Sequence, residues 1–153
     1  MITAEQLGSL HFKQDYGLRL AYVAGAMVKG IASPELVIRM GQAGMLAFYG
    51  AGGMGQEQIE TAITRIASSL ATGQAYGVNL LANPAQPQEE AATVALLLRL
   101  GVRNVEASAY LQVSPALVRF RLHGATLDGQ GRAQAANRII AKLSRPQVAR
   151  QFL

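Results

Sequence analysis

The chain has 153 residues, of which half are hydrophobic and 15% are charged, and its net charge is +5. This length corresponds to about one domain with a buried core, and the composition excludes an intrinsically disordered chain. Because cysteine is absent, disulfides, thiolate zinc sites and a cysteine nucleophile are excluded, and a cytoplasmic location is expected. The apolar stretches are shorter than the roughly 18 residues of a membrane span, and the N-terminus lacks a signal-peptide pattern, so we expect no membrane partner.

The first structural unit lies within residues 20–49. Residues 20–23 form a short apolar run with little polar alternation, which predicts a strand covered on both faces. Ser33 is followed by a proline and an acid, which predicts a helix start, and Gly44 ends this helix in a left-handed conformation. A second apolar run at 45–49 predicts the next strand. The unit is therefore β-α-β.

The same alternation continues along the rest of the chain, after a polar lead-in of residues 1–18 with a helical turn around 4–10. Apolar residues from Ile59 to Leu70 recur at helical spacing and predict an amphipathic helix that ends at Gly73. A polar, glycine-bearing stretch at 128–131 precedes the last strand. The remaining predicted strands are 75–81, 104–110 and 138–143, and the remaining helices begin near residues 89, 114 and 144.

Strands and helices that alternate at intervals of roughly 25–35 residues indicate an α/β fold with a parallel sheet. The sheet is either an open doubly wound sheet or part of a (β/α)8 TIM-type barrel, which needs about 250 residues. The last helix stops after barely two turns, which favours an incomplete barrel. We therefore expect residues 19–153 to form about the first five βα units of one barrel domain.

Residues 50–55 match the G-x-G-x-x-G pattern of dinucleotide-binding folds and lie between a strand and a helix. That site also needs an acidic residue about 20 positions further on, and residues 75–81 contain none. The pattern also follows the second strand instead of the first. We favour a tight turn that lets another group approach the backbone closely.

A few polar residues are predicted at or near the carboxyl ends of buried strands, where α/β barrels bind their ligands. Asn79 either satisfies nearby backbone groups or points a donor and an acceptor at a ligand such as a flavin. Lys142, within an apolar strand, either extends to solvent or faces an anionic part of a ligand. Glu106, Ser108 and Gln112 are candidate walls of a substrate pocket. The two histidines are placed for no catalytic pair, and no metal-ligand cluster is evident.

Positive charge is concentrated in the last quarter of the chain. Residues 1–118 contain seven Lys and Arg and eight Asp and Glu. Residues 119–153 contain seven Lys and Arg but only one acid, Asp128. No aromatic residues interleave with these arginines, so we expect no nucleic-acid partner. A solvated face, or a docking patch for an acidic protein, is the favoured interpretation.

Four segments together resemble a known family: HFKQDYGLRLAYVAGAMVKGIASPELVIRMGQAGMLAFYGAGG, YGVNLLANP, GVRNVEASAYLQVSPALVRFRLHG and NRIIAKLSRPQVARQF. They are similar to the trans-acting enoyl reductases of bacterial polyketide and polyunsaturated-fatty-acid synthases. These enzymes belong to the nitronate monooxygenase (2-nitropropane dioxygenase) superfamily of FMN-dependent barrels. The similarity runs from about Leu7 to Leu153.

This resemblance implies a flavin barrel that reduces an enoyl thioester on an acyl carrier protein, with NAD(P)H as the hydride donor and synthase components as partners. It places Asn79 and the loop formed by Ala24, Gly25, Ala26 and Met27 at the FMN, and Lys142 is a further cofactor-binding candidate. The catalytic residues and the phosphate-binding loops would follow Leu153. We therefore expect the 153-residue chain alone to bind FMN weakly or not at all, to lack turnover, and to self-associate through an open barrel edge.

Two alternatives remain open at this point. One is a nitronate monooxygenase-like flavoenzyme, which shares the barrel and the cofactor. The other is a non-catalytic βα module for binding or assembly, which kept the scaffold without the chemistry.

Overall fold

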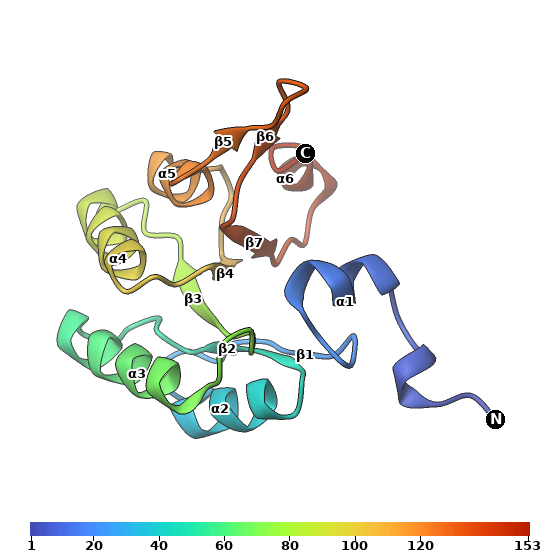
Figure 1. The fold of residues 1–153 in the computed structure, drawn as a ribbon. Helices are drawn as coiled ribbons and strands as arrows, with labels where there is room; N and C mark the ends of the chain where they lie inside the picture. The colour runs from blue at the N-terminus through green and yellow to red at the C-terminus, as the bar shows by residue number, and fades with distance from the viewer. The chain divides into compact units, whose positions relative to one another are not determined.

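A computed structural model describes all 153 residues and shows an α/β fold in which helices and strands alternate (Figure 1). The helices are η1 Ala4–Gln6, α1 Leu10–Tyr16, α2 Pro34–Gln42, α3 Gln56–Ser69, α4 Pro87–Arg99, α5 Pro115–Leu122 and α6 Pro146–Ala149. The strands are β1 Val23–Ala24, β2 Leu46–Tyr49, β3 Gly77–Leu81, β4 Asn104–Ser108, β5 Thr126–Leu127, β6 Ala133–Gln134 and β7 Arg138–Ala141. No helix is both long enough and apolar enough to cross a membrane.

The chain forms two compact units, Met1–Val78 and Asn79–Leu153, and the boundary falls within β3. In the first unit β2 pairs with β1 and with the start of β3, and both ladders are parallel. In the second unit β4 pairs with β7 in a third parallel ladder, and the amide of Ala82, just after β3, donates to the carbonyl of Ser108 in β4. The predicted α/β class with parallel pairing is confirmed.

The helix starts and stops follow the predicted capping residues. The Ser33 hydroxyl accepts a hydrogen bond from the Leu36 amide at 3.3 Å, and the Ser114 hydroxyl accepts one from the Leu117 amide at 3.1 Å. Each satisfies an amide that has no partner within its helix. Gly44 has φ +71°, a left-handed conformation that carries the chain from α2 toward β2. These predictions from the sequence are confirmed.

The prediction for the first strand is wrong in its burial and shifted in its position. β1 covers only Val23–Ala24, and the side chains of Tyr22 and Val23 are exposed. Before the strand, the amides of Arg19 and Leu20 both donate to the Gly44 carbonyl, so this stretch bends around the end of α2 and is not extended. Apolar content alone therefore predicted more strand and more burial than this segment has.

The lead-in contains a helix that the sequence analysis did not predict. The predicted turn around 4–10 corresponds only to η1, whereas α1 follows it at Leu10–Tyr16. The Ser9 hydroxyl caps α1 by accepting from the Phe12 amide, and Gly17 ends it at φ +65°. A serine cap and a closing glycine were therefore present, but the helix buries no residue and shows no apolar stripe.

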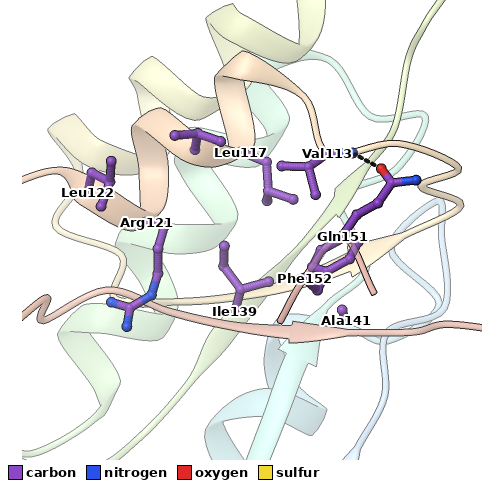
Figure 2. Close-up of a pocket in the computed structure, with 9 residues that line it drawn as sticks. Val113, Leu117, Arg121, Leu122, Ile139, Ala141, Gln151 and Phe152 are labelled. Carbon is purple, nitrogen blue, oxygen red and sulfur yellow. Dashed lines mark hydrogen bonds between the residues drawn. The ribbon is translucent and has the colours of Figure 1, made fainter. Parts of the chain in front are cut away.

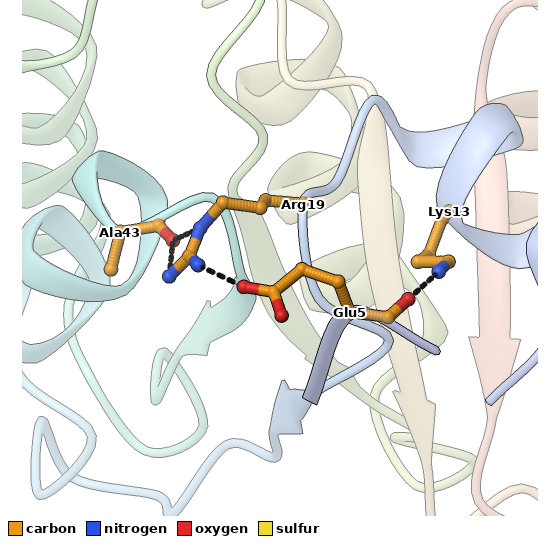
Figure 3. A network of polar contacts seen from close by, with 4 residues as sticks. All are labelled: Glu5, Lys13, Arg19 and Ala43. Atoms are coloured by element: carbon orange, nitrogen blue, oxygen red, sulfur yellow. Dashed lines mark hydrogen bonds and ion pairs between the residues drawn. The ribbon is translucent and has the colours of Figure 1, made fainter. Parts of the chain in front are cut away.

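A polar network ties this lead-in to the rest of the first unit (Figure 3). The Arg19 guanidinium lies 2.8 Å from the Glu5 carboxylate and also donates to the Ala43 carbonyl at the end of α2. The Lys13 ammonium donates to the Glu5 carbonyl. Because the ion pair is exposed, its contribution is about 0–1 kcal/mol, and its role is to position η1.

A second unpredicted element is the antiparallel hairpin of β5 and β6. The Asp128 carboxylate organises its turn by accepting from the backbone amides of Gln130 and Arg132. The chain then returns through the fully buried Asn137, whose amide donates to the Phe120 carbonyl at 2.7 Å. The stretch predicted as a polar connection is thus the tip of a hairpin.

Candidate functional site

Polar side chains from two neighbouring strands share one face of the second unit. In β3, Asn79 alternates with the buried Val78 and Leu80, and in β4 Glu106 and Ser108 alternate with buried apolar residues. Because successive strand residues point to opposite faces, one face is apolar and the other polar. All three polar side chains are buried.

Asn79 is the centre of this cluster. Its side-chain amide donates to the Ser108 hydroxyl at 2.8 Å and to the Glu106 carbonyl at 3.3 Å. A backbone carbonyl can only accept, so the amide nitrogen must face Glu106 and the amide oxygen must point elsewhere. That oxygen has no hydrogen-bond partner, although the residue is only 2% exposed. The strand therefore holds a buried acceptor that no group of the described chain satisfies.

Lys142 follows β7 and lies beside the same cluster. Its ammonium is 3.1 Å from the Glu106 carboxylate, and the side chains of Lys142 and Glu106 are 46% and 3% exposed. Its backbone amide donates to the Ala107 carbonyl at 2.9 Å, which fixes the start of the side chain. The lysine thus neutralises a buried carboxylate, a partner that the sequence analysis did not consider for it.

Gln112 does not lie with the other two predicted pocket walls. β4 ends at Ser108 because Ala109 adopts φ +61°, a left-handed conformation that is rare outside glycine, and the chain leaves the strand there. Gln112 is exposed on the following loop and lines a cavity between this loop and the loop after β3. Glu106 and Ser108 are not among the residues that line this cavity.

A buried acid that the sequence analysis treated only as part of a helix start is central to these two loops. The Glu90 carboxylate, on α4, accepts hydrogen bonds from the hydroxyls of Tyr110 (2.9 Å) and Ser114, and weakly from the Asn83 amide. Burial, together with the charge of Glu90, raises the pKa of the Tyr110 phenol. The phenol therefore stays protonated and donates. Only the fold, which brings Tyr110 and Ser114 to Glu90 from 20 and 24 positions away, reveals this cluster.

The predicted flavin loop, Ala24 to Met27, belongs to the first unit and is held by a close backbone approach. A Cβ atom added to Gly50 would lie 1.7 Å from the Met27 carbonyl oxygen. The Gly30 amide donates to the Gly50 carbonyl at 2.9 Å, and the Lys29 amide donates to the Gly52 carbonyl at 2.8 Å. The glycine pattern after β2 therefore lets the preceding loop approach its backbone, as favoured from the sequence.

A second hollow in the second unit lies on the opposite face of β7 (Figure 2). Ile139 and Ala141 contribute to it together with Leu117 of α5 and Phe152, so it is mainly apolar. The Gln151 side chain spans its end by accepting from the Val113 amide at 3.2 Å and donating to the Leu111 carbonyl at 3.4 Å. Because strand residues alternate, this hollow is separate from the cluster around Asn79.

The polar groups of the Asn79 cluster can bind an organic ligand that carries an N–H group. The cluster offers one buried acceptor oxygen, an amide already fixed by the protein, and an internally neutralised Glu106–Lys142 pair. No group of three or more His, Cys, Asp or Glu side chains is arranged to hold a metal ion. An oxidised flavin ring carries one N–H group between two carbonyls, and this donor fits the free oxygen of Asn79.

No family model matches the chain, but comparison with known proteins finds relatives that are all polyketide or polyunsaturated-fatty-acid synthase proteins. It is 50% identical over 152 residues to the polyketide biosynthesis protein PksE of Bacillus subtilis, and 48% identical over 149 residues to ThaF of Burkholderia thailandensis. It is 38% identical over 151 residues to a component of the polyunsaturated fatty acid synthase of Thraustochytrium sp.. These alignments include 97–99% of this chain but only 20%, 13% and 10% of the respective relatives.

A solved structure agrees with these relatives. The enoyl reductase domain of MlnA, from the macrolactin biosynthesis cluster of Bacillus amyloliquefaciens, matches with a TM-score of 0.94 and 44% identity. The match covers 98% of this chain and 34% of that one. The resemblance predicted from the four sequence segments is therefore confirmed, while the chain spans only a minor part of each of these relatives.

Replacing Gly50 by alanine should destabilise the first unit. The added Cβ would overlap the Met27 carbonyl, so the loop must move, at a cost of about 2–4 kcal/mol in the free energy of unfolding. Gly129→Ala is the matched control, because Gly129 has open space around it and no left-handed φ. Urea unfolding measures both variants. Equal midpoints for the two would contradict the close approach.

Replacing Ser108 by alanine should loosen the Asn79 amide. The amide would lose its 2.8 Å acceptor and keep only the Glu106 carbonyl, at a cost of about 1 kcal/mol. Hydrogen exchange of the Asn79 side-chain NH₂, followed by NMR, should accelerate. Ser68→Ala, on the exposed face of α3, should change neither stability nor this exchange. Unchanged exchange in Ser108→Ala would refute the assigned hydrogen bond.

Lys142→Met should leave the Glu106 carboxylate buried without its counter-ion. We expect a loss of about 1–3 kcal/mol, because one partner is buried while the lysine is half exposed. Glu106→Gln combined with Lys142→Met should recover part of this loss, which a double-mutant cycle of urea unfolding measures. Strictly additive effects of the two substitutions would show that the pair is not coupled.

Proposed function

We propose that this chain, an enoyl reductase-like relative of polyketide and polyunsaturated-fatty-acid synthase components, contributes to an FMN-dependent oxidoreductase. In this proposal the enzyme reduces enoyl thioesters carried on an acyl carrier protein, with NAD(P)H as the hydride donor, in the cytoplasm. The named relatives support a role in polyketide or fatty acid biosynthesis. The similarity to the enoyl reductase domain of MlnA supports the reaction type.

The parallel βα units support a barrel as the setting for this chemistry. In our proposal the five strands β1, β2, β3, β4 and β7 are the first five of a (β/α)8 barrel. Ligands of such barrels bind at the carboxyl ends of the strands. Ser108 is the last residue of β4 and Lys142 directly follows β7, while Asn79, in the middle of β3, donates to the Ser108 hydroxyl. The cluster is therefore where a barrel enzyme of this type would hold its cofactor.

The buried, unpartnered oxygen of Asn79 is the observation that carries the cofactor assignment. Burying a polar atom without a partner costs about 1–3 kcal/mol, so a ligand that donates to this oxygen would gain binding energy there. Asn79 would accept from the ring N–H of FMN, and Ser108 would hold the amide in the orientation that makes this possible. When bound, FMN supplies hydride transfer to an electron-poor double bond.

The other candidate residues take supporting roles in this proposal. The loop of Ala24, Gly25, Ala26 and Met27, fixed through Gly50, would cover part of the flavin ring. Lys142, which neutralises Glu106, would also place its positive charge near the ring. This charge would stabilise a bound ligand that carries extra electron density. The arginine-rich last quarter of the chain would favour an acidic partner such as a carrier protein.

The proposal predicts that FMN binds through Asn79. In NMR titrations of the chain with millimolar FMN, which reaches the weak binding expected of this chain alone, FMN should shift the Asn79 side-chain NH₂ signals, whereas an FMN analogue methylated at the ring N–H should not. Asn79→Leu should weaken FMN binding about tenfold, because one buried hydrogen bond is lost.

Two outcomes would contradict this assignment. One is FMN binding that leaves the Asn79 signals unmoved, and the other is equal binding of the methylated analogue. Because the 153-residue chain alone is expected to lack turnover, reaction assays that separate the enzyme classes use the polypeptide extended to a complete barrel: turnover of a crotonyl thioester with NADPH supports an enoyl reductase. Oxidation of a nitronate by O₂ would instead favour the monooxygenase alternative.

A further inference from the structure

A cavity of about 410 Å³ lies between the loop after β3 and the loop after β4, entirely within the second unit. Its volume falls within the range of small-molecule sites, about 300–1,000 Å³. We propose that this cavity seats the neutral, linear chain of an acyl thioester, either its acyl part or its pantetheine arm. This inference rests on the proposed function and names the substrate-binding surface that accompanies the cluster around Asn79.

The lining of the cavity selects for a neutral chain. No lysine or arginine lines it, and its one charged group, Glu90, is buried and already accepts hydrogen bonds from Tyr110 and Ser114. A phosphate or carboxylate would therefore find no counter-ion there and would be repelled by Glu90. The apolar part of the lining includes Ala82, Pro84, Pro87, Ala109, Leu111 and Val113.

The rim of the cavity can recognise amide groups along such a chain. Gln112 is exposed at the rim, and its carboxamide can donate and accept at once. Leu111, beside it, exposes 71% of its surface and so offers an apolar side chain to a ligand in the cavity. A pantetheine arm alternates amides with apolar segments, and an acyl chain is apolar throughout, so both fit this lining.

The cavity and the candidate cofactor site are joined by short stretches of backbone. Ala82 lies three residues beyond Asn79, which corresponds to about 10 Å of extended chain. The Ala82 amide donates to the Ser108 carbonyl at 3.0 Å, and Ala109, which lines the cavity, follows Ser108. A thioester whose double bond reaches a ligand held by Asn79 could therefore lay the rest of its chain in this cavity.

The walls of the cavity are held from both sides. Glu90 fixes Tyr110 and Ser114 from α4, while Gln151 binds the backbone of Leu111 and Val113 from the other flank. Figure 2 shows the Gln151–Val113 contact. The loop after β4 is thus fixed at four of its residues. A preformed cavity loses little entropy when a flexible chain enters it, which favours binding.

The test uses NMR titration of the 153-residue chain with crotonyl-pantetheine. Two further ligands separate the halves of the thioester: free pantetheine, and an octanoyl thioester of N-acetylcysteamine. We expect the backbone amides of Ala82 and Val113 to shift, and Leu111→Glu to weaken binding roughly fivefold or more. Leu127→Glu is the matched control, because Leu127 is also 71% exposed but lies on the β5 hairpin, and it should leave binding unchanged.

Every outcome of these titrations either supports or contradicts the proposed thioester site. Shifts at Ala82 and Val113 with either half-ligand support it and identify the half that the cavity holds. Shifts elsewhere, none at millimolar ligand, or equal effects of the two glutamate substitutions would overturn it. FMN titration of the same samples, followed at the Asn79 side chain, tests the flavin proposal separately. If FMN does not bind but the thioester does, only the flavin assignment is contradicted.

Discussion

One fixed amide organises the functional face of this protein. The carbonyl of Glu106 and the hydroxyl of Ser108 both take hydrogen bonds from the Asn79 nitrogen, and this leaves the Asn79 oxygen buried with nothing to accept from. We propose that this oxygen, on the polar face of a parallel strand, accepts from the N–H of a ligand. The flavin proposal and the neighbouring substrate cavity both depend on this orientation.

The loops of both units are held in place by local contacts. In the first unit, Gly50 lets the loop before α2 lie directly on the turn after β2. In the second unit, Glu90 and Gln151 hold the loop after β4 from two sides. Loops of parallel α/β folds carry the binding residues, and their precision depends on such contacts.

The sequence predicted the periodic elements well and the paired side chains poorly. The strands near 45–49, 75–81, 104–110 and 138–143 were found because they alternate with the predicted helices at regular intervals, and Ser33 and Ser114 gave helix starts. α1 was missed because it buries no residue, and the hairpin because its strands have only two residues each. Asn79 was predicted on the correct strand but near its carboxyl end, whereas it is the middle residue of β3. Its bond to Ser108, the Glu106–Lys142 pair and the Glu90 cluster depend on strand register and loop packing, which no local pattern encodes.

The orientation of Asn79 toward a flavin can be tested most directly by a crystal structure of the chain soaked with FMN. Our account predicts the flavin ring at the ends of β3 and β4, with its ring nitrogen within hydrogen-bond distance of the Asn79 side-chain oxygen and the amide nitrogen still on Ser108. A flavin bound elsewhere, or an Asn79 oxygen that accepts from a protein group instead, would contradict it.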